Sequence, residues 1–77
     1  MKELDRVVLC QDSADAALAA GDMGTIVHAY ADRKAYEVEF VSLTGDTIAV
    51  VTLPAEAVRA VAADEVPHAR KFAPRAA

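Results

Sequence analysis

Two glycines three residues apart, Gly21 and Gly24, lead into the β-branched run 25–27, and this stretch constrains the fold more than any other. Glycine accepts the positive φ angle of a tight bend, and β-branched residues favour an extended strand over a helix. A second strand-like run, residues 36–41, follows the polar segment 32–34. The pattern therefore predicts two strands joined by a turn.

The same criteria place strands at about residues 6–10, 25–30, 36–41, 47–53 and 58–61. Thr44 and Gly45 predict a tight turn between the third and fourth strands, and Pro54 ends the fourth. Residues 55–57 fit one short 3-10 or helical turn before the last strand. The segment 11–22 shows no sustained alternation, so we expect a long first loop with a helical turn around residues 14–20 and Leu18 packed on the core. This order predicts an all-β fold, a small five-stranded Src-homology-3-like barrel.

The register of the third and fourth strands follows from their turn. With Thr44 and Gly45 as the loop, the apolar side chains that fall on one face are Tyr36, Val38, Phe40, Val51 and Leu53. A slip of one residue would bury Glu37 and Glu39, which a small core cannot tolerate. The opposite face then carries these two glutamates beside Val41, Ile48 and Val50.

Composition limits the class of protein. Seventy-seven residues allow one domain, which we place at residues 1–65, followed by a C-terminal tail at 66–77. The domain holds all 12 acidic residues and the tail holds three of the eight basic ones. An acidic body disfavours binding to a phosphate backbone. The single cysteine excludes an internal disulfide, and the N-terminus lacks the pattern of a signal peptide or membrane span, so we expect a cytoplasmic protein.

The sequence offers no constellation typical of an enzyme. His28 and His68 lie 40 residues apart and only one cysteine accompanies them, so we predict no metal site, no cofactor and no catalytic residue. We interpret His28 as a structural residue of the second strand and Cys10 as a small core residue at the end of the first. The spacing of Gly21 and Gly24 is not that of a dinucleotide-binding loop.

The stretch 18–27, with Gly21-Asp22-Met23-Gly24-Thr25, resembles the glycine-centred motif of ribosomal and transcription-factor barrels of the Kyrpides–Ouzounis–Woese type. Together with the segments 35–40, 45–47 and 50–53 it more closely resembles the short bacterial proteins of domain-of-unknown-function family 4926, over residues 3–70. This resemblance implies a Src-homology-3-like barrel without an assigned activity. It also implies genes placed beside another small gene, as in toxin–antitoxin or immunity pairs.

These observations predict a non-enzymatic protein-binding module, the acidic neutralising partner of a small basic protein encoded by a neighbouring gene. The residues expected to bind the partner are Tyr30, Glu37, Glu39, Val41, Ile48 and Val50, which combine negative charge with an apolar strip. Two alternatives remain open. One is a nucleic-acid or ribosome-associated barrel that uses Arg33, Lys34 and the tail, and the other is a homodimer in which the strip pairs with itself.

Overall fold

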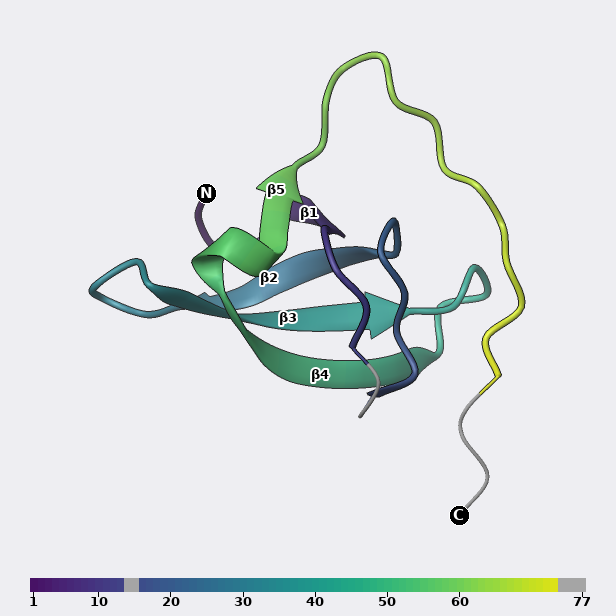
Figure 1. Cartoon of the computed structure of the whole chain (residues 1–77), viewed down its shortest axis with the longest axis horizontal. Coiled ribbons are helices and arrows are strands. Elements are labelled where there is room, and N and C mark those ends of the chain that lie inside the picture. Colours follow the sequence, from purple (N-terminus) through teal and green to yellow (C-terminus); the bar gives the residue numbers. More distant parts are fainter. Residues whose placement is uncertain (14–15, 74–77) are drawn as a thin grey trace.

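The computed structural model describes residues 1–13 and 16–73, and it contains one five-stranded antiparallel sheet with the strand order β4-β3-β2-β1-β5 (Figure 1). The elements are β1 (Arg6–Leu9), β2 (Met23–Ala29), β3 (Ala35–Val41), β4 (Thr47–Pro54), the 3-10 turn η2 (Ala55–Ala57) and β5 (Val58–Ala60). The predicted all-β class, the five strands and the short turn before the last strand are confirmed.

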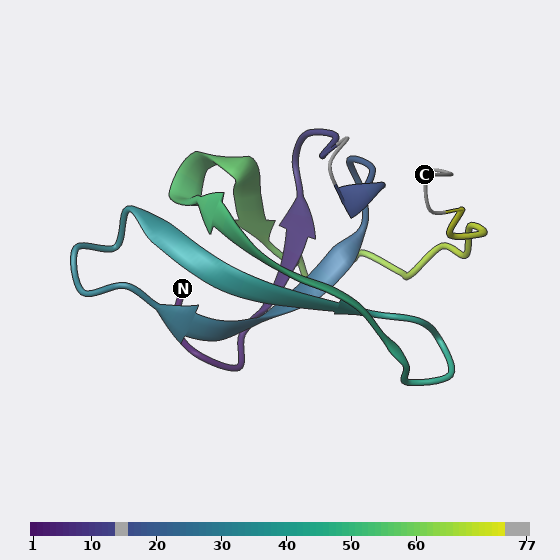
Figure 2. The ribbon, with the colours of Figure 1, turned by 90° about the horizontal axis from the view of Figure 1, so that it is seen from below.

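The sheet is not closed into a barrel, so the prediction of a closed barrel is wrong. In the part of the chain that the structure describes, β4 and β5 form the two borders of the sheet and do not pair with each other. The closing strand β5 has only three residues and pairs with β1 alone. Figure 2 shows β1 running across the direction of β3, because the sheet is strongly twisted.

The core lies on one face of the sheet and follows the predicted register. Phe40 pairs with Ala49, Val38 with Val51 and Tyr36 with Leu53. Ten buried side chains form one cluster: Val7, Leu9, Leu18, Ile26, Tyr36, Val38, Phe40, Leu53, Ala57 and Val58. Val51, which we also predicted for this face, packs against the cluster and is half-buried. Burial of this apolar surface is the main force that holds so small a sheet together.

The first loop is attached to this core at one point. Leu18 is 4% exposed, and its backbone N–H and C=O both bond to Ser13, which confirms the prediction that Leu18 packs on the core. The predicted helical turn around residues 14–20 includes residues 14 and 15, which lie outside the described residues. Gly21 closes the loop with a φ angle of +97° and donates its N–H to the carbonyl of Leu9 at 2.7 Å. A left-handed residue at this bend explains the first glycine of the motif.

Two β-bulges interrupt the alternation of side chains. In β2 the pairing steps from Ile26–Val38 to His28–Glu37, which leaves Val27 as an extra residue. In β4 it steps from Phe40–Ala49 to Val41–Thr47, which leaves Ile48 as an extra residue. An extra residue shifts the alternation by one position. As a result Val27 and His28 are both exposed, whereas Ile48 and Ala49 are both half-buried.

After β5 the chain continues as an irregular arm, residues 61–73, which runs back along the body (Figure 1). Arg59 bonds to both carboxylate oxygens of Glu65, at 2.8 and 2.6 Å. Farther along the arm, Nε of Arg70 donates to Oδ1 of Asp22 at 2.7 Å, and its Nη2 donates to Oδ2. The arm is therefore held against the body by two bidentate ion pairs.

Candidate functional site: the outer face of the sheet

The face of the sheet opposite the core carries the two glutamates of β3. Glu37 pairs with His28 of β2 and Thr52 of β4, and Glu39 pairs with Thr25 and Val50. In antiparallel sheets the side chains of directly paired residues lie on the same face. The two carboxylates therefore project from β3, between the neighbouring strands β2 and β4, on the face that the sequence predicted.

Exposed apolar side chains surround the two glutamates. Their exposed fractions are 40% for Val27, 37% for Tyr30, 47% for Val41 and 55% for Val50. We refer to Tyr30, Glu37, Glu39, Val41 and Val50 as the outer-face patch. These are five of the six residues that we predicted for partner binding, and the structure brings them together on β3 and its two neighbours.

Ile48 is not part of this patch. It packs against the core cluster and is half-buried, so its predicted place on the outward face is wrong. The cause is the bulge in β4, which puts Ile48 and Ala49 opposite the single residue Phe40. No feature of the sequence marks this position, because β-bulges depend on how two strands fit together.

The charges of the outer-face patch are not neutralised by the described part of the chain. Glu37 accepts a hydrogen bond from the hydroxyl of Tyr30 at 3.4 Å, and Glu39 accepts one from the hydroxyl of Thr47 at 2.8 Å. Among the described residues, neither carboxylate has a cationic side chain within 4.0 Å. Hydroxyl donors orient the two carboxylates and leave their charge available to a partner.

His28 belongs to the same region, although we had interpreted it only as a structural residue. Its ring stacks edge-on against Tyr30 with 4.7 Å between ring centroids, and its Nδ1 lies 3.8 Å from Oε1 of Glu3. The contact fixes the position of the Tyr30 ring beside Glu37. Sequence reasoning missed this arrangement because the bulge at Val27 turns His28 outward.

A second concave surface lies between the arm and the body. This groove has a volume of about 510 Å³, and apolar side chains from both sides line it, among them Leu18, Phe40, Ile48 and Phe72. Asp22 stands at its border with 16% of its side chain exposed. Burial by itself raises the pKa of Asp22, but the hydrogen bonds from Arg70 and from the Ala19 amide outweigh it, so this pKa lies below its usual value.

The described residues bring together no three potential metal ligands of the His, Cys, Asp or Glu type. Cys10 is exposed, so its interpretation as a core residue is wrong: β1 ends at Leu9, and the chain turns into the loop one residue before we expected. No helix in the described part of the chain is long and apolar enough to span a membrane.

The fold and the patch define a small all-β protein with a single open sheet and an acidic, partly apolar outer face. The family model of the domain of unknown function DUF4926 matches residues 3–60, and the chain therefore belongs to this family. The match includes all five strands. No curated protein and no solved structure matches the chain.

Proposed function

We propose that this protein is a non-enzymatic binding module whose outer-face patch captures a small basic protein and neutralises it. The observation that carries the proposal is the pair of half-buried glutamates on β3, which lie among exposed apolar side chains and lack a cationic partner in the described structure. The cytoplasm and a companion encoded by a neighbouring gene belong to the same proposal, as in toxin–antitoxin or immunity pairs.

The physical argument has two parts. The net charge of −4 attracts a cationic protein over distance and raises its association rate. Once the partner is in contact, burial of Tyr30, Val41 and Val50 excludes water and supplies most of the affinity. Tyr30 is the best anchor of the patch, because its ring is already positioned by His28 and it loses little conformational freedom on binding.

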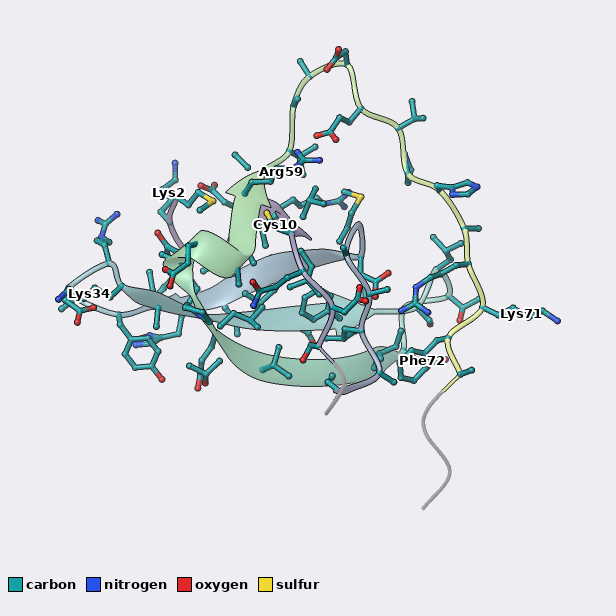
Figure 3. The ribbon with its side chains drawn as sticks, in the orientation of Figure 1. Lys2, Cys10, Lys34, Arg59, Lys71 and Phe72 are labelled. Atoms are coloured by element: carbon teal, nitrogen blue, oxygen red, sulfur yellow. The ribbon has the colours of Figure 1, made fainter. Side chains whose placement is uncertain are left out.

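The order of the elements supports an open variant of the Src-homology-3-like arrangement, a scaffold that presents the outer face of its sheet. Binding to nucleic acid is the weaker alternative. Arg33 and Lys34 lie in the β2–β3 turn, whereas Arg70 pairs with Asp22, and Figure 3 shows Lys34 and Lys71 at opposite ends of the molecule. Scattered cations of this kind do not form the continuous basic surface that phosphate binding needs.

The test is affinity capture from extracts of the native cell, with quantitative mass spectrometry. We expect a stoichiometric basic protein with the natural sequence, and its loss with the double variant Glu37→Lys and Glu39→Lys. The matched control is Glu56→Lys with Asp64→Lys, which changes the net charge equally at exposed positions away from the patch.

The two pairs of variants separate charge at the patch from charge in general. If the control loses the companion as completely as the patch variant, bulk charge and not the outer face is responsible. If neither variant changes the captured proteins, the outer-face patch is not the binding surface and the proposal fails.

A further inference from the structure

The border strand β4 is unusually open to another strand. It is the longest strand of the described sheet, and β3 is its single strand neighbour. None of its residues is charged, and five of the eight are β-branched. Sheet borders normally carry charges, or are very short, because unpaired N–H and C=O groups attract other strands. The opposite border, β5, follows this rule, with three residues and Arg59 at its centre.

The hydrogen bonds to β3 show which backbone groups of β4 have no strand partner among the described residues. Just beyond β4, Ala55 donates its N–H to the carbonyl of Lys34 at 2.9 Å, and bonding alternates from there along an antiparallel pair. Leu53 and Val51 therefore turn their N–H and C=O groups toward β3. Val50 and Thr52 turn theirs away from the sheet. Pro54, which has no N–H, falls on an outward-turned position, as this alternation requires.

We propose that β4 pairs with β4 of a second copy of this chain, antiparallel and about a two-fold axis at Val51. In this register Val50 of each copy faces Thr52 of the other, and each such pair exchanges both of its N–H···O bonds, about four hydrogen bonds in total. The sheet becomes continuous across the two copies. This inference stands independently of the proposed function.

A second copy fits this border because the usable segment is symmetric about its centre. The bulge at Ile48 limits pairing at one end and Pro54 limits it at the other, which leaves residues 49–53 with Val51 in the middle. Two-fold symmetry places the same residues on both sides of the interface.

Charge does not oppose the pairing. The glutamates of β3 in the two copies are three strand spacings apart, about 14 Å. This exceeds the screening length of about 8 Å at physiological ionic strength, so their repulsion is largely screened. The pairing also joins the two outer faces into one surface.

The first test is the solution mass by sedimentation equilibrium across a range of concentrations. We expect the natural protein to approach twice the 8.1 kDa of one chain. Thr52→Pro removes an N–H that points away from β3, so the variant should keep its circular dichroism spectrum and bind itself at least about 10-fold more weakly. Thr52→Ala is the matched control, because it shortens the side chain and keeps the N–H, and it should still dimerise.

The second test fixes the register and does not depend on a proline. In a Cys10→Ser background, Val51→Cys should form a disulfide between copies under mild oxidation, because facing residues in a non-hydrogen-bonded pair lie at a separation that a disulfide spans. Leu43→Cys, at an exposed position outside β4, is the control and should cross-link far more slowly.

Each outcome decides the matter. A natural protein that keeps the mass of one chain at every concentration overturns the proposal. A dimer that Thr52→Pro leaves unchanged, or one that Leu43→Cys traps as readily as Val51→Cys, shows that the copies meet through another surface and also overturns it.

Discussion

Gly24 is the position where the structure makes its sharpest prediction about stability. It is buried in β2, and a Cβ atom added to it would lie 2.5 Å from Cγ1 of Val38, 3.0 Å from the carbonyl oxygen of Glu39 and 3.1 Å from Cε1 of Phe40. Real Cβ atoms essentially never lie within 3.0 Å of another heavy atom, so the contact with Val38 cannot form as it stands, and the other two are tight. The carbonyl belongs to β3, which is paired on both sides, and it cannot rotate away, so Gly24→Ala must displace either Val38 or the pairing of β2 with β3.

The size of the effect follows from two opposing contributions. Overpacking by one methyl group in a tight core costs about 1–3 kcal/mol, and contact with backbone places this case in the upper half of that range. Alanine recovers about 0.5–1 kcal/mol because it restricts the unfolded chain. The net loss is about 1–2.5 kcal/mol, which for a domain of this length lowers the melting temperature by about 4–20 °C.

The assay is thermal and urea unfolding followed by circular dichroism, with a double-mutant cycle as the control. Val38→Ala removes the Cγ1 atom that causes the shortest contact, so Gly24→Ala should cost less in that background than in the natural sequence. If Gly24→Ala leaves the stability unchanged, or if the two substitutions are simply additive, the crowding argument is wrong. The second glycine of the motif is then not explained by close packing of β2 and β3.

Three further predictions test the bulge, the arm and its ion pairs. Ile48→Ala should lower the free energy of unfolding in urea by about 1–2 kcal/mol, and Val50→Ala should lower it by less than about 0.5 kcal/mol, because only Ile48 packs on the core. Equal losses would contradict the bulge. Arg70→Ala should release the arm and lower the heteronuclear NOE of the arm's backbone amides. Adding Asp22→Asn to Arg70→Ala should change this NOE little further. A NOE that neither substitution affects would show that the ion pair does not hold the arm. Hydrogen bonding by Arg59 lowers the pKa of Glu65 to about 2, from an ordinary 4.5. This pair therefore stabilises the fold above about pH 4.5 and loses its effect as the pH falls toward 2, so a carboxyl NMR titration with a midpoint near 4.5 would refute the pairing.

Prediction from the sequence succeeded where one local pattern decided the outcome. The alternation of apolar and acidic residues in β3 predicted the pairing of Tyr36 with Leu53 and of Val38 with Val51. The turn itself is longer than the predicted two residues, because Val41 pairs with Thr47 and Ser42 donates its N–H to the carbonyl of Asp46, and the bulge at Ile48 restores the predicted register. Burial of either β3 glutamate would have cost far more than any competing contact could return, so the register had one solution.

The candidate site was predictable to the same extent and failed at one residue. Glu37, Glu39 and Val50 lie on the outer face because simple alternation holds around them. Ile48 does not, because a bulge reverses the alternation within its strand. Whether an extra residue is accommodated in a strand depends on the twist and fit of its neighbour, which a linear pattern does not contain.

The sequence by itself determined the strands, their order along the chain, the face that is buried and the acidic character of the other face, since these follow from residue type and period. Only the tertiary structure decided that the sheet stays open and that β4 is a free border. It also decided that Arg70 of the arm reaches Asp22, 48 residues away along the chain. Such features depend on distances between segments far apart in sequence, and these are fixed only when twisted strands pack around a common core.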